Sequence, residues 1–252
     1  MIKLFRSAVF AGIAIGTAGF GYLASGLQSS YGSLVGAVLF SFGLLTVVGY
    51  KLKLYTGTAG FIKKNEVGDL FLILLGNIIG CLCMALLSRM SPMDIQAAAQ
   101  KVLELRLGTG GLKCGLLAIG CGFIMTTAVQ FARQGQYLPL VFGVPLFIVC
   151  GFPHCVADAF YFLCVPFAFI KAHFWAVIGL YLCLVLGNMV RLSFFSNATF
   201  LPRLVRPVRR VRPVRQSRQH CPNGTDTILK NVMGQYGREK REQERAERDA
   251  MP

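Results

Sequence analysis

Long apolar stretches alternate with short polar segments over most of this chain. A helix needs ~20 apolar residues to cross the ~30 Å hydrocarbon core of a bilayer. Six stretches meet this length, at residues 5–26, 31–50, 69–88, 112–132, 138–162 and 173–190. The pattern therefore predicts an all-α membrane protein with six transmembrane helices. Gly151 and Pro153 interrupt the fifth stretch.

Composition supports this prediction and separates a second region. Of the 252 residues, 54% are hydrophobic, and the mean hydropathy is +0.57. Fourteen of the 26 Lys and Arg residues lie after residue 190. We therefore expect a six-span transmembrane domain over residues 1–195 and a basic cytoplasmic tail over residues 196–252.

The distribution of basic residues predicts the orientation of the chain. Lys and Arg are enriched in the cytoplasmic loops of membrane proteins. With the N-terminus inside, the segment 51–64 and the tail bring most of the basic residues to the cytoplasm. An even number of crossings also returns the C-terminus to that side. We expect a multi-pass protein of the cell (inner) membrane with both termini cytoplasmic.

The chain contains a weak internal repeat. The segment "LLGNIIG", which contains Asn77, lies in the third stretch, and "VLGNMVR", which contains Asn188, closes the sixth. The turn-rich segment 53–61 follows the second stretch, and the segment 150–158 interrupts the fifth. Each half holds three crossings, an odd number, so the halves would be inverted. Inverted repeats are common in transporters, with broken helices around a site at the repeat interface. We predict two inverted three-helix repeats with broken second and fifth helices.

The predicted breaks place polar residues inside the apolar region. Broken backbone in a membrane must be buried in protein or line a wet cavity, so Thr56 and His154 are expected to approach each other at mid-depth. An ionisable group inside a span is by default a functional candidate, which applies to His154. Asp158, one helical turn later, either orients the imidazole or caps the half-helix that starts near Pro153, and we favour the cap.

The remaining polar residues and the cysteines are predicted to have structural roles. Asn77 and Asn188 are expected to hydrogen-bond between helices. The nine cysteines lack the paired spacing of a zinc site, so we expect no metal and no cofactor. One imidazole and one carboxylate without a nucleophile make a poor active site, so we do not expect an enzyme.

Five segments, taken together, resemble the formate/nitrite transporter family. In chain order they are "KLYTGTAGF", "ILLGNIIG", "AIGCGFIMTTAV", "GFPHCVADAF" and "LVLGNMV". The resemblance covers about residues 5–195. It implies an aquaporin-like fold and a homopentamer with one pore in each protomer. It also implies small monovalent anions as substrates, such as formate, nitrite, hydrosulfide, lactate and acetate.

The resemblance also implies which residues line the pore. His154 matches the central histidine of the family, and Thr56 matches the threonine of the loop after the second span. Leu54 and Phe40 match the hydrophobic constriction on the cytoplasmic side. Phe147 matches the constriction on the periplasmic side.

The chain departs from the family pattern at several positions. Gly122 and Asp158 each stand where many members have Asn, and Pro153 stands where the usual Glu precedes the histidine. The lysine that the family carries ahead of the fourth span aligns by spacing with an arginine, and two lysines lie nearby. We expect the positive charge of a vestibule to come from one or more of three residues: Arg106, Lys101 and Lys113.

The expected mechanism is transport of an anion with the help of a proton. Desolvation of a bare ion costs several kcal/mol, whereas a neutral acid crosses an apolar ring more easily. Either His154 donates the proton, since histidine titrates near pH ~6.5, or water donates it and a neutral His154 only binds the solute. Two other functions stay open: an aquaporin-like pore for water or neutral solutes, and a membrane scaffold that displays the tail.

The tail itself contains "RLVRPVRRVRPVRQSR" at residues 203–218, with seven arginines. Basic clusters next to a membrane bind anionic lipids, with about 1 kcal/mol per basic residue. Aromatic residues do not interleave the arginines, so the stacking surface of a single-stranded nucleic acid site is missing. We expect anionic lipids as partners of the tail and no nucleic acid.

Overall fold

The computed structural model describes residues 1–29, 31–59 and 67–190, and within these ranges the chain forms helices without any strand. Among the described residues, four helices are long and apolar enough to cross a membrane. They are α1 (Ile2–Gln28), α2 (Gly32–Gly49), α4 (Val67–Ser88) and α6 (Gly111–Arg133). They lie where the first four apolar stretches predicted them. The sixth stretch forms α10 (Phe174–Val190), a shorter apolar helix.

Two interruptions occur where the sequence predicted broken helices. The chain leaves α2 after Gly49 and resumes with the single turn α3 (Tyr55–Thr58). The fifth stretch forms α7 (Leu138–Val149) and then α8 (Cys155–Cys164). Between α7 and α8, Gly151 has a positive φ of 69°, and Pro153 has no amide hydrogen for a helical bond.

Two further helices were not predicted. The segment that the sequence analysis treated as a connection contains α5 (Ile95–Thr109), which begins where Asp94 Oδ1 accepts a hydrogen bond of 3.0 Å from the Ala97 amide. A short helix, α9 (Phe167–Ala172), follows Pro166. α5 mixes polar and apolar residues and, at 15 residues, is too short to cross a bilayer, so its hydropathy does not mark it as a membrane span.

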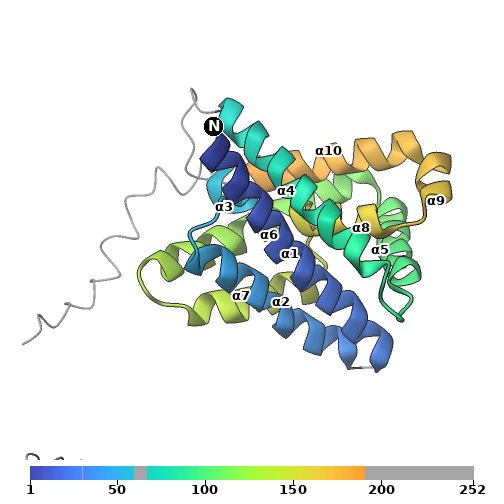
Figure 1. The fold of residues 1–252 in the computed structure, drawn as a ribbon, viewed down its shortest axis with the longest axis horizontal. Coiled ribbons are helices and arrows are strands. Elements are labelled where there is room, and N and C mark those ends of the chain that lie inside the picture. The colour runs from blue at the N-terminus through green and yellow to red at the C-terminus, as the bar shows by residue number, and fades with distance from the viewer. Residues whose placement is uncertain (30, 60–66, 191–252) are drawn as a thin grey trace, which may run out of the picture. The chain divides into compact units, whose positions relative to one another are not determined.

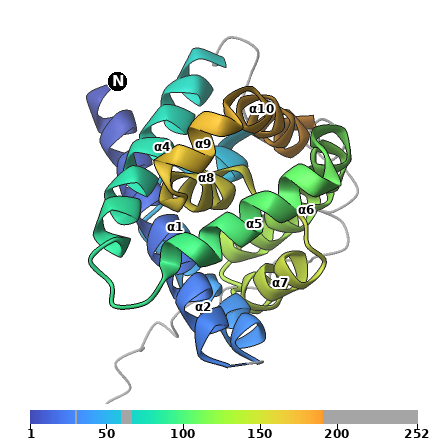
Figure 2. The same ribbon diagram turned by 90° about the vertical axis from the view of Figure 1, so that its right-hand side faces the viewer.

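The helices form two similar groups around the breaks. α1 packs along α2 and α4, and α6 packs along α7 and α10 (Figure 1). α2 packs against α7 and so joins the groups. α8 lies in the middle, in contact with α1, α4, α5 and α10 (Figure 2). Both breaks therefore lie among packed helices. The predicted basic tail, residues 196–252, lies outside the described residues.

Glycines allow the closest approaches between these helices. A β-carbon added to Gly80 of α4 would collide with the Val9 carbonyl of α1, and one added to Gly187 of α10 would collide with the Gly115 carbonyl of α6. Membrane helices associate through such small residues because lipid supplies no hydrophobic force between them.

We predict that Gly187→Ala lowers the stability of the protein in detergent. Overpacking a tight interface costs about 1–3 kcal/mol, so the thermal unfolding midpoint should fall. Gly179 lies on the same helix with nothing within 4 Å of an added β-carbon. Gly179→Ala should keep or raise the midpoint, and equal midpoints for the two variants would contradict the packing argument.

Candidate functional site

The two breaks meet at one hydrogen bond. Thr56 comes from α3, and His154 is the residue that caps the start of α8. Thr56 Oγ1 and His154 Nε2 lie 2.9 Å apart, although 98 residues separate them in the chain. Each residue is 1% exposed. The predicted approach of these two residues is therefore present in the structure.

The bonds of His154 assign its tautomer. Nδ1 accepts a hydrogen bond of 3.2 Å from the Ala157 amide, so a neutral ring carries its hydrogen on Nε2. Nε2 then donates to Thr56 Oγ1, which leaves the Thr56 hydroxyl hydrogen free to donate to another group. A second proton on the ring would sit on Nδ1, facing the Ala157 N–H, and would remove that bond.

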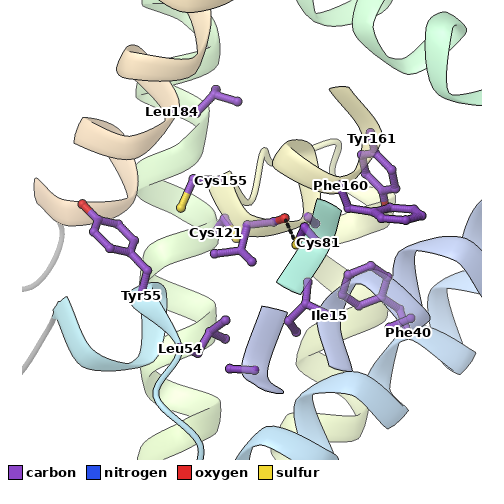
Figure 3. Packing of buried hydrophobic residues seen from close by; sticks show 14 of the residues in the cluster. Ile15, Phe40, Leu54, Tyr55, Cys81, Cys121, Cys155, Phe160, Tyr161 and Leu184 are labelled. Carbon is purple, nitrogen blue, oxygen red and sulfur yellow. Dashed lines mark hydrogen bonds between the residues drawn. The ribbon is translucent and has the colours of Figure 1, made fainter. Parts of the chain in front are cut away.

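Aromatic rings cover one side of His154. The Phe147 ring stacks on the imidazole with centroids 5.8 Å apart and an interplanar angle of 28°. The Phe40 ring stands edge-on to Phe147, at 6.2 Å and 89°. The resemblance groups Phe40 with Leu54, and that grouping stays a prediction; in the structure the Phe40 ring contacts Phe147. Figure 3 shows Phe40 and Leu54 well apart, with Ile15 between them in that view.

Leu54 instead borders a cavity of about 560 Å³ at the end of α2. The wall comes from the ends of α2 and α6, the α2–α3 connection, α3 and Tyr137. The lining includes three basic residues, Lys51, Lys53 and Arg133. The described part of that lining contains no Asp or Glu. The described lining of this cavity is therefore basic, and a concave surface with charges of one sign is the kind that concentrates counter-ions.

Asn77 holds the first break. Its Oδ1 accepts a hydrogen bond of 2.8 Å from the Tyr55 amide. Its Nδ2 donates to the carbonyls of Ala8, at 2.8 Å, and Lys53, at 3.0 Å. Asn77 is fully buried. It thus satisfies a donor and an acceptor that the interrupted helix leaves without partners, and it ties them to α1.

Asn188 makes the matching set of bonds at the second break. Its Oδ1 accepts from the Cys155 amide at 2.7 Å, and its Nδ2 donates to the carbonyls of Ala118, at 2.7 Å, and Pro153, at 3.2 Å. The bonds to Ala8 and Ala118 are the predicted bonds between helices. The structure shows that each asparagine also bonds a carbonyl within a break and the first amide of the helix that follows it.

The conformation of the two breaks is also alike. Lys51 and Gly151, each just after the end of a helix, have φ values of 54° and 69°. Glycine adopts positive φ without strain, whereas a residue with a β-carbon does so rarely. Among the described non-glycine residues, Lys51 alone has a positive φ, and it lines the cavity.

Asp158 and Arg106 form an ion pair beside His154. Arg106 Nε lies 3.2 Å from Asp158 Oδ1, and its Nη1 donates to the Gly151 carbonyl at 2.7 Å. Asp158 Oδ2 accepts a hydrogen bond of 2.9 Å from the His154 amide. The side chain of Asp158 is 1% exposed and that of Arg106 is 14% exposed. This pair was not predicted from the sequence. Charged groups inside a span commonly pair with one another. The signal in the sequence that could have led to this pair is therefore a basic residue on a neighbouring segment.

The other predicted residues lie further from this centre. Lys101 on α5 and Lys113 on α6 are exposed, and no hydrogen bond in the described chain ties either of them to the break. Gly122 is buried on α6. Cys81 contacts the backbone of α8 through the Val156 carbonyl, at 3.4 Å (Figure 3). Among the described residues, no three His, Cys, Asp or Glu side chains are placed to hold a metal.

Comparison with known proteins identifies the family. Residues 1–199 match the model of the formate/nitrite transporter family. The chain belongs to this family. The family consists of transporters and not of enzymes, and the chain is accordingly a multi-pass membrane protein.

Individual members of the family are similar over much of the chain. An uncharacterized transporter of Bacillus subtilis, YrhG, is 30% identical over 187 residues, which are 64% of this chain and 68% of that protein. The formate channel FocA of Haemophilus influenzae is 26% identical over 171 residues, or 58% of this chain and 59% of that protein.

Solved structures of the family share the fold. A pentameric formate channel with formate bound has a TM-score of 0.66 and 22% identity, and covers 77% of this chain and 94% of its own. A formate/nitrite transporter family ion channel has a TM-score of 0.63 and 20% identity, and covers 77% of this chain and 87% of its own.

We predict that Asn188→Ala destabilises the protein by about 3 kcal/mol. Each buried polar group that loses its partner costs about 1–3 kcal/mol, and this change affects three backbone groups. The thermal unfolding midpoint in detergent measures the effect. Thr127→Ala removes an exposed hydroxyl that bonds only its own helix, and should leave the midpoint within error. A midpoint for Asn188→Ala equal to that control would contradict the bracing role.

Proposed function

We propose that this protein is a transmembrane channel for small monovalent anions of the formate, nitrite and hydrosulfide type, and that a proton accompanies the anion. The observation that carries the proposal is the buried Thr56–His154 bond between two broken helices. Broken backbone inside a membrane is tolerated where it is buried or lines a path. The family membership and the formate channel among the similar proteins support the substrate class.

The proposed architecture consists of six crossings in two inverted three-helix repeats. α1, α2 with α3, and α4 form the first repeat, and α6, α7 with α8, and α10 form the second. The matching bonds of Asn77 and Asn188 support this assignment. Three crossings per repeat require that the second repeat be inverted, so that the two breaks enter from opposite sides and meet near the midplane.

We propose a homopentamer in the cell (inner) membrane with both termini cytoplasmic. The likeness to a pentameric formate channel supports the assembly. Large apolar side chains are exposed along the outer faces of the long helices, such as Phe42 of α2 and Phe71 of α4, where lipid or a neighbouring subunit would cover them. The basic bias of segment 51–64 supports the orientation.

The proposed path runs from the cavity past Leu54 to Thr56 and His154, and then past Phe147 and Phe40. An anion collects in the cavity, where Lys51 and Lys53 supply positive charge. The apolar side chains that follow oppose a bare charge, because desolvation of an ion costs several kcal/mol. The solute therefore crosses them as a neutral acid and releases its proton beyond.

His154 acts in this proposal as a neutral hydrogen-bond donor. Its Nδ1 is occupied by the Ala157 amide, so a proton added there would lose a bond and face another donor. The proton thus comes from water in the vestibule. The Thr56 hydroxyl, which already accepts from Nε2, is polarised to donate to an oxygen or sulfur of the solute.

We predict that His154→Asn lowers anion flux about tenfold without moving the pH at which flux is half-maximal. Asn still caps the start of α8 but loses the Nε2 bond to Thr56. A net hydrogen bond of about 1 kcal/mol accounts for most of this factor. Uptake of formate, nitrite and hydrosulfide into liposomes, from about pH 5 to 8, measures both quantities, since a histidine titrates within this range.

His173→Asn is the matched control, because His173 is exposed at the end of α9, and it should behave as the unaltered protein. A shifted pH profile in His154→Asn would show that His154 itself donates the proton. Unchanged flux at every pH would exclude a direct role for His154. Glycerol or water flux without anion flux in the unaltered protein would replace the proposal with the neutral-solute pore.

We predict that replacement of Lys51 and Lys53 by Gln together lowers anion flux about tenfold at low ionic strength, since charged clefts raise association rates by this factor or more. The loss should shrink as salt rises, because the Debye length falls from ~30 Å at 0.01 M to ~3 Å at 1 M. Lys171→Gln, an exposed charge on α9, should have no such effect. A loss that is independent of salt would contradict collection of anions by charge.

A further inference from the structure

We propose that Arg106 and Asp158 are positioning residues that hold the broken backbone around His154, and that Arg106 is not a charge that collects anions. The expected effect on anion flux rests on the proposed function. The contacts of Arg106 and Asp158 with the second break, which we call the clamp, are a property of the folded chain. Arg106 lies in the last turn of α5, the helix that connects the two groups and packs across α8 (Figure 2).

The two members of the ion pair form hydrogen bonds to the second break at both of its ends. Arg106 Nη1 bonds the Gly151 carbonyl on the α7 side. Asp158 Oδ2 bonds the His154 amide on the α8 side. The 3.2 Å contact between Arg106 Nε and Asp158 Oδ1 connects these two hydrogen bonds. The four residues thus form a closed set of contacts around Pro153, which supplies no amide of its own.

Within residues 31–59 and 67–190, no ion pair holds the backbone of the first break. Its described bonds come from neutral groups: Asn77 bonds the Tyr55 amide and the Lys53 carbonyl, and Ser7 Oγ accepts from the Lys53 amide at 3.1 Å. The second break has the matching asparagine, and the ion pair in addition. The extra clamp therefore lies at the break that carries the imidazole, whose ring must stay aligned with Thr56.

The same contacts neutralise the positive charge of Arg106. The guanidinium has Asp158 on its Nε and the Gly151 carbonyl on its Nη1, and its side chain is 14% exposed. A charged pair in contact has no net charge, so it attracts an approaching anion far less than a lone arginine would. Removal of one member of such a buried pair leaves an uncompensated charge, whereas neutral replacement of both members is tolerated.

The test compares Arg106→Gln, Asp158→Asn and the double variant, in full-length protein reconstituted in liposomes. Arg106→Gln leaves the Asp158 carboxylate without its cation and should lower the maximal formate flux at least tenfold. The double variant keeps a neutral donor and acceptor at the two positions, and should recover most of the flux. Glu104→Gln changes an exposed charge on the same helix and serves as the control. If Arg106 collected anions, the double variant would be as defective as Arg106→Gln, and that result would overturn the proposal.

Hydrogen–deuterium exchange in the same samples tests the clamp without any transport. Arg106→Gln should speed exchange of the amides in residues 150–158 about tenfold, because bonds to charged groups contribute more than neutral ones. Exchange around residues 51–58 should stay unchanged, and the double variant should restore protection. Unchanged exchange at 150–158 in Arg106→Gln would overturn the clamp even if flux fell. Absence of anion flux in the unaltered protein, with the exchange pattern as expected, would overturn only the proposed function.

Discussion

The need to bond every interrupted backbone group inside an apolar medium governs this structure. Water is not available there to pair an amide or a carbonyl, and each unpaired group costs several kcal/mol. Asn77 and Asn188 meet this need by bonding a freed amide, a freed carbonyl and a neighbouring helix at once. The breaks persist because these two side chains replace the missing helical bonds.

Once the breaks are held, the chemistry at the centre follows from their position. The chain turns at each break and presents one polar side chain inward, Thr56 from the first and His154 from the second. The two sides of this centre then differ. A basic cavity lies next to Leu54, whereas Phe147 stacks on the imidazole and Arg106 is paired with Asp158. The two breaks thus produce a site with distinct faces.

Much of the helical framework was predictable, since the length of an apolar stretch is a local property. The positions of the long helices follow from hydropathy, the first break from the turn-rich segment 53–61, and the second from Gly151 and Pro153. The approach of Thr56 to His154 was also predictable, because polar residues at two breaks have few other places to go. α5 was missed, because its mixed polar and apolar residues resemble a connection. The place of Phe40 beside Phe147 depended on how α2 packs against α7.

The sequence by itself therefore determined which segments are apolar helices, where they break, and which family the chain resembles. Only the tertiary structure decided the partners of the buried polar groups. Arg106 looked like a free charge in the sequence, but α5 brings it to Asp158 and Gly151, 52 and 45 residues away. A hydrogen bond depends on distances of a few tenths of an ångström between segments remote in the chain. Such distances are set by the packing of whole helices, which no local pattern of residues contains.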